Sequence, residues 1–340
     1  MKRRVGIWLV IVLGLILVLA ACGEKSQESI VAELDKKLSS MDGYKAKAEM
    51  NMKTGQEDQK YDIDIWHKKK DFYRVTLASD QDEKGSQVIL KNEDGVFVLT
   101  PALKKSFKFQ TDWPQNSSQP YLFESLVNDV KKDTEAVFTA TDTHFIFQTK
   151  TNYQSNNNLP FQEIHFDKKN LTPVLVKVLD KDKTALVEVT FSSFDINPSF
   201  QENDFKVDEN MAAGAMDADV PVSGAETNNS FVVAFPLYMA GAEFTDKKEV
   251  TLDNGQRVIM TFEGEKNFTL IQEKFDVIPV LASPIEVSGE IVNLGFTIGA
   301  LSNKKIEWSH NGVDFYLASE DLTKEELIEV AQSVQGREVK

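Results

Sequence analysis

Cysteine and histidine are scarce in this sequence of 340 residues. Cys22 is the single cysteine, so no pair exists for a disulfide. The four histidines are isolated from cysteine and from one another at ligand spacing. Because a zinc site needs three or four nitrogen or sulfur ligands, usually with two of them close in sequence, the sequence predicts no metal and no cofactor. The histidines are His67, His144, His165 and His310.

The sequence also lacks the motifs of common catalytic sites. It has no Gly-x-Ser-x-Gly element and no glycine-rich phosphate loop. Residues 302–305 match Ser-x-x-Lys without the companion elements, and residues 180–183 lack the glycine and glutamate of a calcium loop. We therefore predict that the protein is not an enzyme. Paired acids from distant segments leave no sequence signal, so a cell-wall hydrolase, or an accessory subunit of one, stays open as the alternative.

Positive charge is in deficit, with 38 lysines and arginines against 53 acidic residues and a net charge of −15. This balance excludes nucleic-acid binding through phosphate neutralisation. The chain is 41% hydrophobic and 27% charged, which excludes collagen, coiled coil and wholesale disorder. At roughly 100 to 200 residues per domain, the length predicts two domains.

The first 21 residues differ from the rest. Lys2, Arg3 and Arg4 precede an uncharged run that ends at Ala21, which is typical of an export signal. The run closes on residues 19–22, Leu-Ala-Ala-Cys, which form the lipobox of bacterial lipoproteins. The alternative is a plain transmembrane anchor, but the chain's one cysteine stands where lipid attachment requires it. We therefore predict cleavage after residue 21 and lipidation of Cys22.

The predicted cleavage defines a tethered protein. It removes three positive charges and no negative ones, so the net charge falls from −15 to −18. Two acyl chains on Cys22 give stable anchoring, which a single chain does not. We expect a body held on the outer face of the cytoplasmic membrane, with residues 22–28 as a polar tether.

Hydrophobic periodicity divides the mature chain. Apolar residues at helical spacing predict helices over about 29–41 and 119–132. Period-two alternation, interrupted by turn residues, predicts about eleven antiparallel strands. A sheet of that size usually curls or splits, and the helices could cover its concave face. The strands are expected near 44–52, 61–65, 71–77, 86–91, 95–100, 105–109, 136–141, 144–149, 162–167, 172–179 and 184–192.

A second domain follows a predicted linker. Residues 211–230 are small, polar and without period, which favours a linker between domains at 29–210 and 231–340. Two Asn-Gly pairs, at 254–255 and 311–312, predict hairpins. Thr323 and Glu326 form a capping box at the start of a final helix. The fold class is thus mainly β with α, and the second domain is a small α+β unit.

The first domain is rich in large apolar residues that alternate inward. Either they fill the curled sheet as core, or they leave a concave pocket for an apolar ligand; the sequence does not decide between these. In the second case we expect residues of neighbouring strands and of the middle helix to line the pocket. These candidates are Met50, Met52, Ile63, Ile65, Leu122, Phe123, Leu126, Phe145 and Phe147.

Several segments carry a family resemblance. Residues 41–44 read Met-Asp-Gly-Tyr, residues 92–101 read Asn-Glu-Asp-Gly-Val-Phe-Val-Leu-Thr-Pro, and residues 194–197 read Phe-Asp-Ile-Asn before Phe205. With the lipobox, their order and spacing resemble the LolA/LolB lipoprotein-carrier family over about residues 28–210. The resemblance implies a half-open antiparallel barrel with helices as a lid over a hydrophobic cavity.

The two-domain layout extends this resemblance. It is similar to RseB-type sensors and to the LolA-like lipoproteins of spore-forming Gram-positive bacteria, and a lipidated Cys22 would fix the body to one membrane, unlike a soluble carrier. The implied function is a non-catalytic binding or sensor module for a hydrophobic ligand, such as a lipid or acyl chain, or for an envelope protein. Sporulation or envelope stress is the implied setting.

Overall fold

The computed structural model describes most of the chain from residue 25 onward. The predicted signal segment and Cys22 lie outside the described residues. Within the described part, no helix has the length and apolar character needed to cross a membrane. The described residues are 25–53, 58–79, 82–115, 117–153, 159–218, 232–275, 284–287, 289–294, 297–310 and 312–336.

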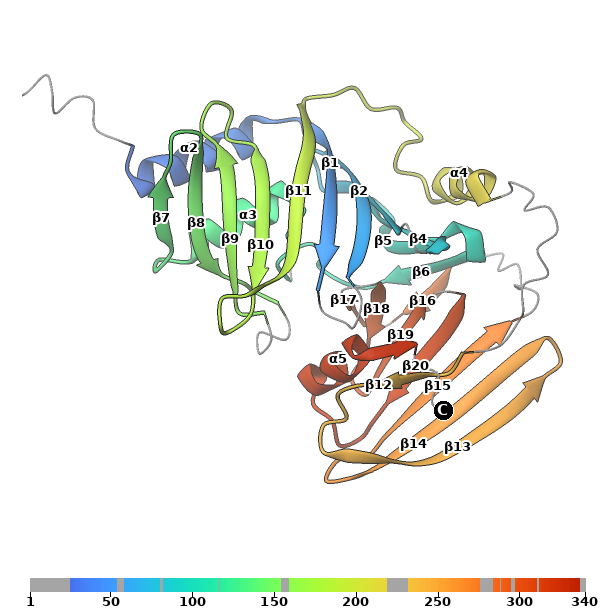
Figure 1. The fold of residues 1–340 in the computed structure, drawn as a ribbon. Coiled ribbons are helices and arrows are strands. Elements are labelled where there is room, and N and C mark those ends of the chain that lie inside the picture. Colours follow the sequence, from blue (N-terminus) through green and yellow to red (C-terminus); the bar gives the residue numbers. More distant parts are fainter. Residues whose placement is uncertain are drawn as a thin grey trace, which may run out of the picture.

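The first domain is one large antiparallel sheet, and all eleven predicted strands are present. The central strand β1 pairs with β2 on one side and β11 on the other, so the sheet runs β6-β5-β4-β3-β2-β1-β11-β10-β9-β8-β7 (Figure 1). It does not close into a barrel, which confirms the half-open architecture. The strands are β1 (Gly43–Met52), β2 (Gln59–Lys68), β3 (Phe72–Ser79), β4 (Asp82–Asn92), β5 (Gly95–Thr100), β6 (Lys105–Phe109), β7 (Val137–Ala140), β8 (His144–Lys150), β9 (Phe161–Asp167), β10 (Pro173–Leu179) and β11 (Ala185–Ile196).

Alternation in β1 shows why these segments form a half-buried sheet. Ala46, Ala48 and Met50 are buried, whereas Lys45 and Lys47 between them are more exposed. Side chains of a strand point to opposite faces in turn, so one face of β1 joins the core and the other meets solvent. The same alternation in β2 and β3 builds the apolar concave face.

Two helices cover the concave face. Helix α2 (Gln27–Ser40) begins at Ser26, whose hydroxyl accepts a hydrogen bond from the Ser29 amide, and buries Ile30 and Leu34. Helix α3 (Phe123–Lys132) contacts α2 and buries an apolar face against the sheet. Both helices lie behind strands β7–β11 in Figure 1. The predicted lid is therefore present, and α3 starts at Phe123 rather than at residue 119.

A third helix covers part of the opposite face. Helix α4 (Val207–Ala218) packs Met211 against an apolar cluster on β4 and β5 that includes Leu90 and Phe97. The Asn210 side chain accepts a hydrogen bond from Arg74 Nε at 2.6 Å. Residues 211–218, which we expected to belong to the linker, are helical. The alanines that made this segment look like a linker are also strong helix formers. The expected linker residues 219–230 lie outside the described residues.

The second domain is a seven-stranded sheet with one helix, as the α+β prediction required. Its order is β13-β14-β15-β20-β19-β18-β17, and a two-residue turn at 253–254 joins β13 to β14. Helix α5 (Lys324–Gln332) has the predicted capping box between Thr323 and Glu326. The strands are β13 (Ala242–Leu252), β14 (Gly255–Gly264), β15 (Phe268–Phe275), β17 (Glu290–Asn293), β18 (Ile298–Leu301), β19 (Lys305–His310) and β20 (Val313–Ala318), with the separate pair β12 (Ala234–Pro236) and β21 (Val334–Gly336).

The two domains are joined by backbone and side-chain bonds. Strand β16 (Ile285–Val287) leaves the second domain and pairs in parallel with β6, which makes it the twelfth strand of the first sheet. Gln87 Oε1 accepts hydrogen bonds from the Thr297 hydroxyl and the Ile298 amide, both at 3.0 Å. Lys105 forms an ion pair with Asp314 across the same interface. These bonds fix the second domain against the open end of the first sheet.

Candidate functional site

The deep interior of the half-barrel is filled by side chains. All nine predicted ligand-binding residues are at most 5% exposed and belong to the apolar core, and seven of them lie away from the cavities described below. Phe123 packs edge-to-face on Tyr44 and Phe166, each with ring centres 6.3 Å apart. The seven are Ile63, Ile65, Leu122, Phe123, Leu126, Phe145 and Phe147.

A cavity of about 470 Å³ lies between the two domains, where β1 ends and β11 begins. The other two predicted residues, Met50 and Met52, border it from β1. The structure thus divides the predicted residues: two border the cavity and seven form the core beside it. The remaining apolar and small wall residues of the first domain are Pro120, Leu159, Leu186 and Val187.

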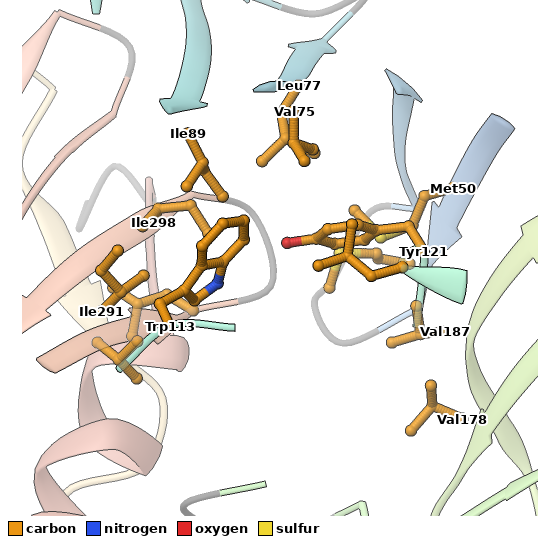
Figure 2. Packing of buried hydrophobic residues seen from close by; sticks show 14 of the residues in the cluster. Met50, Val75, Leu77, Ile89, Trp113, Tyr121, Val178, Val187, Ile291 and Ile298 are labelled. Carbon is orange, nitrogen blue, oxygen red and sulfur yellow. The ribbon is translucent and has the colours of Figure 1, made fainter. Parts of the chain in front are cut away.

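The second domain supplies the facing wall. Ile291, Val292 and Leu294 come from β17 and its end, and Ile328 comes from α5. In the view of Figure 2, Ile291 lies on the side of Trp113, whereas Met50 and Val187 lie on the other side with Tyr121. Most buried apolar residues of both domains belong to one continuous cluster, apart from the smaller cluster under α4. The cavity is therefore a partly open cleft between the two domains, bordered by a core that they share.

Polar groups border the end of the cavity nearest α3. Gln119 and Tyr153 line it, and Gln119 Oε1 accepts a hydrogen bond from the Tyr121 hydroxyl at 2.8 Å. Burial raises the pKa of Tyr153, so its hydroxyl is protonated. Ser117 adjoins them in the chain, and Lys53 and Asp180 also border the cavity. The arrangement combines apolar walls with a few polar groups, as small-molecule sites commonly do.

A buried carboxylate lies behind this polar end. Asp129 Oδ2 accepts hydrogen bonds from the Ser118 hydroxyl at 2.8 Å and from Gln162 Nε2 at 2.7 Å. Burial raises the pKa of Asp129, and the two hydrogen bonds act in the opposite direction. Asp129 does not border the cavity, so it holds the loop at Ser118 in place and does not meet a ligand there.

The histidines are spread through the first and second domains. His67 is buried between Tyr44 and Tyr73, with ring centres 5.3 and 4.5 Å away, and burial lowers its pKa to about 4. His144 and His165 face each other at 6.1 Å. Across the described ranges, no group of three or more His, Cys, Asp or Glu side chains could hold a metal ion.

A second interdomain cavity, of about 350 Å³, lies beside the Lys105–Asp314 pair. Its walls include Phe107 of β6 and the stacked rings of Trp308 and Phe315, whose centres are 5.0 Å apart. Both cavities thus lie on the interface between the domains.

Sequence reasoning placed no ligand-binding residue in the second domain. The burial of Ile328 was predictable, because it lies on the apolar face of a capped helix. No sequence pattern predicts the position of Ile291 and Leu294, since only the tertiary arrangement brings them opposite Met52 and Val187. The polar residues Gln119 and Tyr153 stand in loops and gave no periodic signal either.

The architecture defines a two-domain protein with a half-open β-barrel and an interdomain cavity. The family described as sporulation protein YdcC-like matches residues 2–205. Over 326 residues the chain is 49% identical to sporulation protein YdcC of Bacillus subtilis (strain 168). The aligned region covers 96% of this chain and 95% of that protein. The chain therefore belongs to the YdcC-like family of sporulation proteins.

Similar solved structures include MucB of Pseudomonas aeruginosa in a MucA/MucB complex, with a TM-score of 0.34 and 12% identity, covering 91% of this chain and 99% of that one. A LolA superfamily protein from Nitrosomonas europaea has a TM-score of 0.32 and 10% identity, and covers 55% of this chain and all of that one. These solved structures share the fold class that the sequence resemblance implied.

Proposed function

We propose that this protein is a non-catalytic binding module that holds an apolar ligand, such as an acyl chain, in the cavity between its domains. The observation that carries the proposal is the cavity itself, whose walls are apolar on both sides. Its volume of about 470 Å³ lies within the range of roughly 300–1,000 Å³ that is common for small-molecule sites. Each methylene buried there contributes about 0.8 kcal/mol.

The ligand position that we propose differs from the one that the sequence predicted. The half-barrel interior is occupied by Phe123, Phe147 and their neighbours, so the ligand lies at its mouth, against Met50 and Met52. The second domain closes the site with Ile291 and Ile328. Both domains are therefore needed for binding.

Binding of the uncharged dye 1-N-phenylnaphthylamine tests this proposal. The protein is the chain from residue 22 with Cys22→Ser, which contains every described contact. We expect dye fluorescence to rise on binding, and Val187→Phe or Ile291→Phe to weaken binding from opposite walls. Val137→Phe, at a position 58% exposed on β7, is the matched control. Unchanged dye affinity in both wall variants, with melting curves showing that they fold, would refute the cavity as the site.

We further propose that Cys22 carries the lipid that holds this module on the outer face of the cytoplasmic membrane. The support is the lipobox at residues 19–22. Labelled palmitate should enter the wild-type protein and not Cys22→Ala, and the variant should accumulate as precursor or appear in the medium. Labelling that is equal in both proteins would contradict the assignment.

The proposal also excludes hydrolysis of the cell wall. Purified protein incubated with peptidoglycan should release no soluble fragments, with lysozyme as the positive control. Metal-independent release that depends on protein concentration would instead favour the hydrolase alternative.

A further inference from the structure

The polar end of the interdomain cavity has unpartnered hydrogen-bond donors. Four lining residues supply them: Lys53, Ser117, Gln119 and Tyr153. Within the described residues, the Lys53 ammonium, the Ser117 and Tyr153 hydroxyls and the Gln119 Nε2 amine make no hydrogen bond or ion pair. Donors of this kind on the wall of an apolar cavity favour a ligand that brings acceptors.

Two carboxylates that border the cavity have hydrogen-bond partners of their own. Asp180 Oδ1 accepts hydrogen bonds from the amides of Asp182 and Thr184, at 2.9 and 2.8 Å. Glu329 is hydrogen-bonded to Tyr238. Part of the hydrogen-bonding capacity of the two carboxylates is therefore taken up, and the Lys53 ammonium makes no ion pair within the described part of the chain.

Gln119 is the most informative of these residues because it is only 5% exposed. Its backbone amide donates to the Ser125 hydroxyl at 2.8 Å, and its Oε1 is held by the fully buried Tyr121. The amine is thus the end of the side chain left for a ligand. The amine is accessible from the cavity, where a ligand acceptor can take the place of water.

We infer that the ligand of this cavity is a single-chain amphiphile with an anionic, oxygen-rich head, a carboxylate or a phosphate. This inference rests on the proposed function and adds the chemistry of the head. The head accepts hydrogen bonds from Gln119 and Tyr153 and lies near the Lys53 ammonium. The chain lies between Val187 of the first domain and Ile328 of the second.

Three ten-carbon probes separate the head from the chain: decanoate, decyl phosphate and the uncharged methyl decanoate. Each competes with bound 1-N-phenylnaphthylamine. We expect both anions to displace the dye at concentrations on the order of tenfold lower than the ester, because hydrogen bonds to a charged acceptor are stronger than those to a neutral one. Tighter binding of decyl phosphate than decanoate assigns a phosphorylated head, and the reverse order assigns a carboxylate.

Three variants test the donors themselves. Lys53→Met and Tyr153→Phe remove a donor and keep the apolar bulk, so affinity for the anions should fall on the order of tenfold while the ester is unaffected. Gln119→Glu retains the acceptor for Tyr121 and places a negative charge at the head, so it should exclude the anions and retain the ester. Lys36→Met, on the exposed face of α2, is the matched control and should change nothing.

The outcomes distinguish the two levels of the argument. If the dye does not bind the wild type, the proposed function fails and this inference fails with it. If the dye binds but the ester competes as well as the anions, only the anionic head is refuted. An anion preference that survives in Lys53→Met, Tyr153→Phe and Gln119→Glu alike also overturns the inference.

Discussion

Asp129 shows how a single buried residue ties the middle helix to the polar end of the cavity. Its carboxylate accepts hydrogen bonds from Ser118 and Gln162, two segments that flank α3 on different sides. The Ser118 hydroxyl also accepts a hydrogen bond from the Asn152 amide at 2.7 Å. Asp129 therefore fixes the loops that present Gln119 and Tyr153, and its charge is kept in place by hydrogen bonds although burial opposes it.

Asp129→Asn should alter the pH dependence of stability in a defined direction. Burial raises the folded-state pKa of Asp129 above the ordinary value of 3.8. At pH values between 3.8 and this raised pKa, the folded protein therefore binds more protons than the unfolded chain. Wild-type stability therefore falls as pH rises through this window, and this loss persists above it. The neutral asparagine removes the effect and keeps one acceptor.

Urea unfolding of both proteins between pH 4 and pH 8 measures this effect. The free energy of unfolding of the wild type relative to Asp129→Asn should decline as pH rises. Asp142→Asn, in the turn between β7 and β8, is the control and should show no such trend. A wild-type advantage that grows with pH would contradict the assigned shift.

At the scale of elements, the sequence predicted what local periodicity controls. Strands β1–β11, α2, α3 and the capped α5 were predictable because each has its own apolar period or cap. Helix α4 was missed because its small residues suit both a linker and a helix. Strand β16 is three residues long and pairs with a strand about 180 positions earlier, so nothing in its own sequence marks it.

The candidate site was predictable only in part, for the same reason. Met50 and Met52 were found because alternation places them on the concave face. Alternation also selected Ile63 and Phe147, but it cannot tell a cavity wall from a filled core. The difference depends on α3, whose Leu126 and Val127 occupy the interior.

Leu126→Ala separates these two roles of the concave face. Leu126 is fully buried in the core under α3, so the substitution should lower the free energy of unfolding by about 2–5 kcal/mol. Dye affinity should stay within a factor of about two, since Leu126 does not border the cavity. Chemical unfolding and dye titration measure the two effects, with the exposed Val137→Ala as control. Strongly weakened dye binding in a folded Leu126→Ala protein would place the ligand inside the half-barrel.

At the scale of the whole molecule, the second domain is positioned by specific bonds as well as by apolar contact. Strand β16 extends the first sheet, and Gln87 holds the start of β18 through two hydrogen bonds. The Lys105–Asp314 pair is largely removed from solvent, with side chains 14% and 9% exposed. Because the cavity walls belong to different domains, these bonds set the distance between the walls.

Lys105→Met is the sharpest test of this arrangement. It leaves Asp314 buried with only the Ser309 hydroxyl, at 2.6 Å, as its remaining side-chain partner. An uncompensated buried charge typically costs about 3–5 kcal/mol, so we expect a large loss of stability, faster hydrogen exchange in β16 and β18, and weaker dye binding. Replacing both partners, in Lys105→Met with Asp314→Leu, should restore much of the stability, since no charge is then left unpaired.

The exposed pair between Lys150 and Glu135 supplies the control: Lys150→Met should change neither stability nor dye binding measurably. Dye affinity that is unaffected in Lys105→Met, despite the faster exchange at the interface, would show that the cavity does not depend on how the second domain is seated.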